Sequence, residues 1–120
     1  MDKNIEIHNK GWGCEKWIVN NEKYCGKILF FDKDKKCSYH YHIMKHETFY
    51  LQSGLIKIIY GYNDDLNQSY CLILHPGEKF TVEPCLRHQI IALQDSILFE
   101  FSTQHFEEDS YRVIPGSSQL

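Results

Sequence analysis

The residues best suited to chemistry lie together in segment 38–47, whose sequence is SYHYHIMKHE. In a β-strand, residues two positions apart project from the same face, so His40 and His42 would point the same way. Glu47 can fold back toward them from the start of the next strand, and His88 is a fourth candidate on a later strand. Imidazole and carboxylate ligands suit a divalent Zn, Mn, Fe, Co or Ni ion with positions left open for water or substrate.

Two histidines in this spacing also have a plainer interpretation, because polar residues alternate along many half-exposed strands. Three neighbouring features favour a metal site instead. Glu47 follows the histidines closely, Gly54 ends the strand after it, and Gly77, Pro84 and His88 come later in that order. We therefore predict one bound divalent metal ion.

The same residues resemble the two-part signature of the cupins, Gly-x5-His-x-His-x3,4-Glu-x6-Gly and Gly-x5-Pro-x-Gly-x2-His. The residues that carry the resemblance are His40, His42, Glu47, Gly54, Gly77, Pro84 and His88. The sequence departs from the signature in two places: no glycine precedes the histidine pair near Cys37, and Cys85 stands where the second glycine of the later half is usual. The resemblance implies an all-β jelly-roll barrel of two antiparallel sheets, with His40, His42, Glu47 and His88 holding the metal inside its mouth.

The rest of the chain is a succession of short runs of β-branched and aromatic residues broken by turn residues, a pattern typical of strands. Eight or nine strands at this spacing predict a sandwich or closed barrel. The expected strands span residues 16–20, 24–31, 38–44, 48–52, 55–62, 69–74, 80–82, 87–93 and 96–102. Short helical turns are expected to be few, with one in segment 104–111.

A chain of 120 residues has the size of one domain, so residues 1–120 are predicted to form a single cupin domain. Its barrel core would span about residues 16–103, and the Gly- and Ser-containing end, about 115–120, would be a flexible tail. Segment 5–12 looks too polar to pack fully against the rest of the chain.

Two charged residues stand out because they interrupt apolar strands. Lys27 precedes the run Ile-Leu-Phe-Phe, and Glu100 lies within Ile-Leu-Phe-Glu-Phe. A charge in such a strand is costly unless it is paired or faces a wet cavity. Each could equally be an edge-strand charge that faces water, and the sequence leaves both interpretations open.

Beyond the metal ligands, the chain is similar to the cupin domain of mannose-6-phosphate isomerases. The residues that follow that plan are Trp12, Gly13, Lys27, Phe49, Glu100, the acidic segment 107–109 and Arg112. The resemblance implies a metal-dependent isomerase or epimerase of a sugar or sugar phosphate, with Lys27, Glu100 and Arg112 as candidate catalytic residues. In such a reaction a metal polarises the carbonyl and a base moves a proton between neighbouring carbons. The sequence does not decide which of the three residues is that base.

Two other functions remain open: an iron-dependent cupin dioxygenase, and a sugar-binding or regulatory cupin without catalysis. A formal charge of −3 and scattered lysines favour neither a nucleic-acid nor a membrane partner, so the expected partner is a small molecule. Five cysteines without a CxxC pair and no signal-peptide pattern at the start predict reduced thiols and a cytoplasmic location. By analogy with other cupins, the chain is expected to form a homodimer.

Overall fold

The predicted strand pattern is confirmed by a computed structural model, which describes residues 3–120. The strands are β1 (Glu6–Lys10), β2 (Gly13–Asn20), β3 (Cys25–Phe31), β4 (Tyr39–Tyr41), β5 (Glu47–Ser53), β6 (Ile56–Gly61), β7 (Tyr70–Leu74), β8 (Lys79–Val82), β9 (Arg87–Ala92), β10 (Ser96–Ser102) and β11 (Tyr111–Ile114). The helices of the described residues are three-residue 3-10 turns, η1 (Leu66–Gln68), η2 (Glu107–Asp109) and η3 (Ser117–Gln119). None of them is long and apolar enough to cross a membrane.

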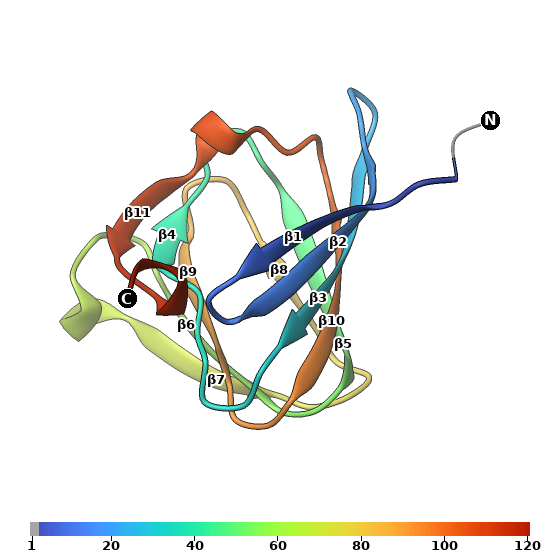
Figure 1. Cartoon of the computed structure of the whole chain (residues 1–120). Helices are drawn as coiled ribbons and strands as arrows, with labels where there is room; N and C mark the ends of the chain where they lie inside the picture. Colours follow the sequence, from blue (N-terminus) through green and yellow to red (C-terminus); the bar gives the residue numbers. More distant parts are fainter. Residues whose placement is uncertain (1–2) are drawn as a thin grey trace.

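The strands form two sheets that curl around a common interior (Figure 1). One sheet has six strands in the order β1-β2-β3-β10-β5-β8, and the other has five in the order β11-β4-β9-β6-β7. All paired strands run antiparallel. The chain is therefore all-β, as the sequence predicts.

The inward-facing residues change character along the strands. Leu29 and Phe31 of β3 and Leu98 of β10 lie in an apolar core, where fully burying each such side chain contributes about 1.5–3 kcal/mol. Further along the same faces come Lys27 and Glu100, which are also buried. One end of the barrel is thus packed with apolar side chains, whereas the other end holds ionic ones.

Two features differ from expectation at the start of the chain and after residue 103. Segment 5–12 contains β1, which pairs with β2, and His8 stacks on Trp17 with ring centroids 4.1 Å apart. An edge strand needs little apolar surface because its pairing comes from backbone hydrogen bonds. The barrel also gains β11, which pairs with β4. The expected helical turn in segment 104–111 is present as η2.

The end of the chain packs against the barrel, which differs from the flexible tail expected for residues 115–120. The Ser117 backbone N–H donates to the Lys36 carbonyl (2.8 Å), and the Lys36 N–H donates to the Ser117 hydroxyl (3.0 Å). The Gly11 N–H donates to the Ser118 hydroxyl at 3.0 Å. Backbone and hydroxyl groups make these contacts, so a hydrophobic pattern gives no sign of them.

Two loop positions explain how the chain meets the glycine pattern of the cupin signature. Gly54 has a φ of +97°, and a side chain there would collide with the backbone of Asp95 and Ser96. Cys85, where the signature has a glycine, itself adopts a φ of +73°. Its N–H donates to the His42 carbonyl at 2.6 Å, which holds this left-handed residue against the segment just after β4. The loop thus keeps the conformation that a glycine would give it.

Candidate metal centre

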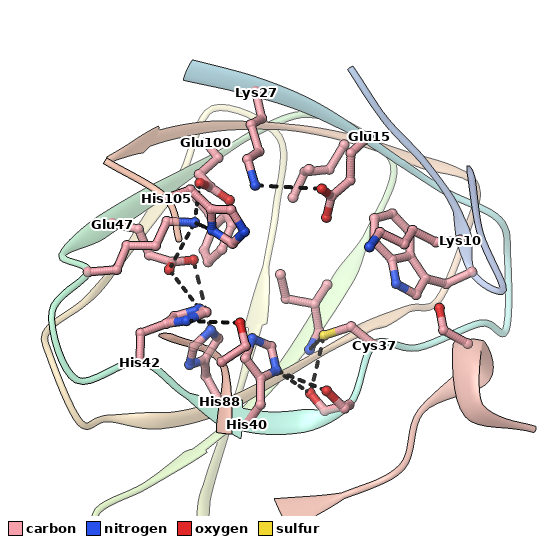
Figure 2. A pocket seen from close by; sticks show the side chains of 18 of the residues that line it. Lys10, Glu15, Lys27, Cys37, His40, His42, Glu47, His88, Glu100 and His105 are labelled. Carbon is pink, nitrogen blue, oxygen red and sulfur yellow. Dashed lines mark hydrogen bonds and ion pairs between the residues drawn. The ribbon is translucent and has the colours of Figure 1, made fainter. Parts of the chain in front are cut away.

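Three histidines converge at the ionic end of the barrel. His40 lies on β4, directly opposite His88 on β9, and His42 follows just after β4. Their ligand nitrogens all lie within 4.8 Å of one another. Alternation along the strand turns His40 and His42 to the same side, and strand pairing brings His88 to them. The close-up in Figure 2 shows the three rings gathered on one wall of a cavity.

Each imidazole is oriented by a backbone carbonyl behind it. The Nδ1 atoms of His40, His42 and His88 lie within hydrogen-bonding distance of carbonyl oxygens. These belong to Ser38, Asp109 and Leu86, at 2.7, 2.8 and 3.0 Å respectively. Because a carbonyl only accepts, each Nδ1 carries the proton, and each Nε2 keeps a free lone pair. Such support behind the ligands is typical of metal-binding histidines.

Glu47 approaches the histidines from the first residue of β5. Its Oε2 lies 3.3 Å from Nε2 of His42, and its Oε1 lies 3.9 Å from Nε2 of His88. Among the described residues, Glu47 Oε2 and His88 Nε2 are buried without a hydrogen-bond partner. An unsatisfied buried polar group costs about 1–3 kcal/mol. A cation between these atoms would satisfy both, so three imidazoles and one carboxylate fit a divalent metal.

The protonation states also fit metal binding. Burial and the neighbouring His42 lower the pKa of His40 to about 3, and burial lowers the pKa of His42 and His88 as well. The three rings are therefore neutral near pH 7, which is the form that binds metal. Burial raises the pKa of Glu47 to about 8 even though the neighbouring Lys45 lowers it, so this carboxylate stays ionised at neutral pH only if a further cation, such as a bound metal ion, lies beside it.

Lys27 and Glu100 face the same cavity from the opposite wall. They lie opposite each other on β3 and β10, and both side chains are buried. They do not pair with each other. Lys27 Nζ lies 3.6 Å from Glu15 Oε1 and 4.2 Å from the centre of the Trp17 ring. These partners offset the cost of burying the Lys27 ammonium group.

Glu100 has a different partner, Lys45, which no feature of the sequence marks as buried. Lys45 is only 2% exposed, and its Nζ lies 2.6 Å from Glu100 Oε2 and 3.8 Å from Glu47 Oε2. It also contacts Nδ1 of His105 at 3.1 Å. A lysine in a short loop after a strand gives no sequence signal of burial, because the alternation of side chains ends with the strand.

The Lys45–Glu100 pair is charged at neutral pH. Burial alone would lower the pKa of Lys45, but Glu47 and Glu100 raise it above its usual value. Burial would raise the pKa of Glu100, but Lys45 and Lys27 lower it to about 2. The ammonium group of Lys45 therefore lies between the side chains of Glu100 and Glu47.

The wall with the three histidines and the opposite wall with Lys27 and Glu100 enclose a cavity of about 400 Å³. Arg112 of β11 also lines it, directly opposite His40 of β4, but its side chain is exposed at the rim. Lys10 of β1 lines the cavity as well (Figure 2). Among the described residues, neither Arg112 nor Lys10 forms an ion pair. His46, by contrast, is exposed.

A buried carboxylate, Asp109 of η2, holds the loop between the histidine pair and Glu47. Its oxygens accept backbone N–H groups from Ile43 (2.9 Å), Met44 (3.2 Å) and Lys45 (3.1 Å). Its own carbonyl orients His42. The acidic segment 107–109 therefore contributes one residue that positions the metal site from behind.

Replacing Asp109 by asparagine is expected to lower the free energy of unfolding by about 2–3 kcal/mol, because hydrogen bonds to a charged acceptor are among the strongest and an amide NH2 would face a backbone N–H. Urea unfolding measures this. Glu108→Gln removes the same charge from the exposed neighbouring position and should change stability by less than about 0.5 kcal/mol. Equal losses in both variants would contradict this role of Asp109.

Comparison with known proteins identifies the class of fold. No protein-family model matches this sequence, and no curated protein matches it either. The capsular polysaccharide assembling protein CapF from Staphylococcus aureus superimposes with a TM-score of 0.80 at 15% identity, over 92% of this chain and 33% of CapF. Oxalate decarboxylase from Bacillus subtilis gives 0.76 at 15% identity, over 91% of this chain and 30% of that one.

A further structure, KdgF from Halomonas sp., has a TM-score of 0.72 at 15% identity, over 88% of this chain and 89% of KdgF. The chain spans about a third of the length of the CapF chains it matches. These similarities establish a cupin-like fold, in agreement with the sequence resemblance. The finer resemblance to mannose-6-phosphate isomerases stays a prediction.

Proposed function

We propose that this chain is a metal-dependent isomerase or epimerase that acts on a sugar or sugar phosphate. The proposal rests on one observation: the two walls of the cavity contain different kinds of side chain. Three histidines and Glu47 line one wall, and the buried charges of Lys27, Lys45 and Glu100 line the other. A site that only bound a metal would have no need of this second set of buried charges, which are costly to desolvate.

The residues divide the work of such a reaction between them. A divalent metal held by His40, His42, Glu47 and His88 would supply Lewis-acid polarisation of the substrate carbonyl. Lys27, beside Glu15, is the group we assign to proton transfer, since this pair faces the cavity. Glu100 is a weak base because its pKa is near 2 and its Oε2 accepts hydrogen bonds from Lys45 and Ser102. We therefore assign Glu100 to positioning Lys45.

The rim of the cavity supports an anionic or hydroxyl-rich substrate. Arg112 can bind a phosphate group through two hydrogen bonds at once, and Lys10 offers a second positive charge. The similarity to CapF, a capsular polysaccharide assembling protein, is consistent with sugar chemistry but shows only the fold. The substrate class is therefore proposed from the cavity and not from the relatives.

Solvent exchange tests the proposal. The metal-loaded chain is incubated in D2O with a panel of aldoses, ketoses and their phosphates, and NMR follows deuterium at C1 and C2. We expect conversion of one substrate with deuterium incorporated at the carbon that loses its proton. A metal-stripped sample is the control.

Two results would contradict the proposal. Sugar binding without any exchange would indicate a binding module. Oxygen consumption by the iron-loaded chain, without exchange, would indicate a dioxygenase.

A further inference from the structure

A second cavity, separate from the metal cavity, lies near the free edges of the two sheets. Strand β8 ends the six-stranded sheet, and β6 lies next to β7, which ends the five-stranded one. The cavity measures about 370 Å³ and shares no lining residue with the metal cavity. Its walls contain Tyr60 of β6, Phe80 of β8, Tyr62 just after β6, and the loop 83–86. We call this cavity the aromatic pocket.

The aromatic rings of this pocket meet at different angles. Tyr60 continues the inward-facing row of Ile58 on β6 and packs against the core, as Phe80 does. The ring centroids of Tyr60 and Phe80 are 5.3 Å apart, with their planes at 53°. Tyr62 is 74% exposed and lies at 71° to Tyr70, which in turn stacks on Tyr60 at 27°. The rings therefore border the pocket from more than one side, instead of forming one flat platform.

Glu83 adds a carboxylate to the aromatic pocket. No lysine, arginine or histidine is among the described residues that line it. Glu83 forms no ion pair with any other residue of the described part of the chain. The nearby Arg87 is directed elsewhere, since its guanidinium lies 3.7 Å from the centre of the Tyr41 ring and its Nε donates to Asp64 at 2.9 Å. The carboxylate of Glu83 is therefore left without a cationic partner.

Aromatic faces beside a carboxylate suit one class of ligand. The face of an aromatic ring is electrostatically negative and attracts cations. Several rings together recognise alkylated ammonium groups, whose methyl groups pack against the rings while the charge is attracted to the ring faces. A neutral ligand such as a sugar gains nothing from this negative potential. The chemistry of the pocket therefore favours an organic cation.

We infer that the aromatic pocket binds a small alkylammonium cation, such as a trimethylammonium group. Among the described residues, no cation–π contact uses Tyr60, Tyr62 or Phe80, so the chain does not fill the pocket with a cation of its own. The volume of the pocket lies within the range of small-molecule sites, which is roughly 300–1,000 Å³. Binding there is independent of the proposed isomerase reaction, because none of these residues lines the metal cavity.

Two probes of the same shape test this site. Choline carries a trimethylammonium group, and its neutral isostere dimethylbutanol has a carbon atom in place of the nitrogen. Isothermal titration calorimetry of the full, metal-loaded chain should show that choline binds. The neutral isostere should bind about 10-fold more weakly or worse, because it loses the attraction to the rings and to Glu83.

Variants with matched controls locate the binding. Glu83→Gln should weaken choline binding by about 10-fold and Tyr62→Leu by about 3-fold or more, since one removes the charge and the other an aromatic face. Glu22→Gln and Tyr24→Leu remove the same groups between β2 and β3, outside the pocket lining, and should bind choline as the wild type does. All four positions are exposed, so the variants should fold, and far-UV circular dichroism checks this.

The site assignment would be overturned by several results. One is the absence of binding up to about 50 mM choline. Equal affinity for choline and its neutral isostere, or tighter binding of glucose than of choline, would show that positive charge is not what the pocket recognises. Choline binding that stays unchanged in both Glu83→Gln and Tyr62→Leu would place the cation elsewhere on the chain.

Discussion

Replacing His88 by alanine is expected to lower bound metal from about one ion per chain to less than about a tenth, with an affinity loss of 100-fold or more. His88 is the ligand whose Nε2 is buried without a partner among the described residues, and it lies on a different strand from His40 and His42. Removing His88 leaves only His40, His42 and Glu47 as ligands for the metal. Elemental analysis of the purified chain gives the metal content directly.

The same variant should lose metal-dependent stabilisation. A ligand present at 100 times its dissociation constant stabilises the folded state by about 2.7 kcal/mol. Added zinc or manganese should therefore raise the melting temperature of the wild type but not of His88→Ala. His46→Ala is the matched control, since His46 is exposed and should keep both metal and stabilisation. Equal metal content in the two variants would refute the ligand assignment.

Changing Lys27 to methionine is expected to lower turnover by about 100-fold or more while leaving metal content unchanged, because a proton-transfer group is lost but no ligand is. Methionine keeps the length and apolar stem of the side chain. Steady-state kinetics on the substrate found by solvent exchange, together with metal analysis, makes the measurement.

Two further variants separate proton transfer from positioning. Lys57→Met removes a lysine from β6, on the other sheet and outside the cavity lining, and should leave turnover unchanged. Glu100→Gln should also lower turnover, because it removes the ion pair that positions Lys45. Glu100→Asp keeps a carboxylate for this ion pair and should therefore restore part of the turnover. A Lys27→Met variant with normal turnover would remove Lys27 from the mechanism.

Strand alternation and the cupin resemblance together predict much of this molecule. The two-residue spacing places His40 and His42 on one face, and the later half of the signature brings in His88. Lys27 and Glu100 are selected because a charge within an apolar strand is costly unless it is paired or faces a wet cavity. The structure places both residues on the cavity wall. These predictions succeed because side-chain direction in a strand follows a fixed rule.

The residues that sequence reasoning missed lie where that rule does not apply. Lys45 and His105 are in loops, so nothing in the sequence gives their side-chain direction. The acidic segment 107–109 is recognised from the sequence, but the buried role of Asp109 is not, because this residue lies in a single 3-10 turn. β1 is an edge strand with few buried side chains. The final turn η3 is fixed by hydrogen bonds of serine and backbone groups. Such contacts depend on tertiary proximity, for which a hydrophobic pattern contains no signal.

The change from apolar to ionic residues along single strands has a consequence for engineering this barrel. Stabilising substitutions in natural proteins commonly reduce activity where the active site needs flexibility or strain. Here Leu98 and Glu100 are neighbours on one face of β10, yet Leu98 lies in the apolar core and Glu100 lies on the cavity wall. Repacking only the apolar end would raise the free energy of unfolding without touching the ionic end. The ionic end could then be redesigned for other substrates, because the added stability would offset the cost of those substitutions.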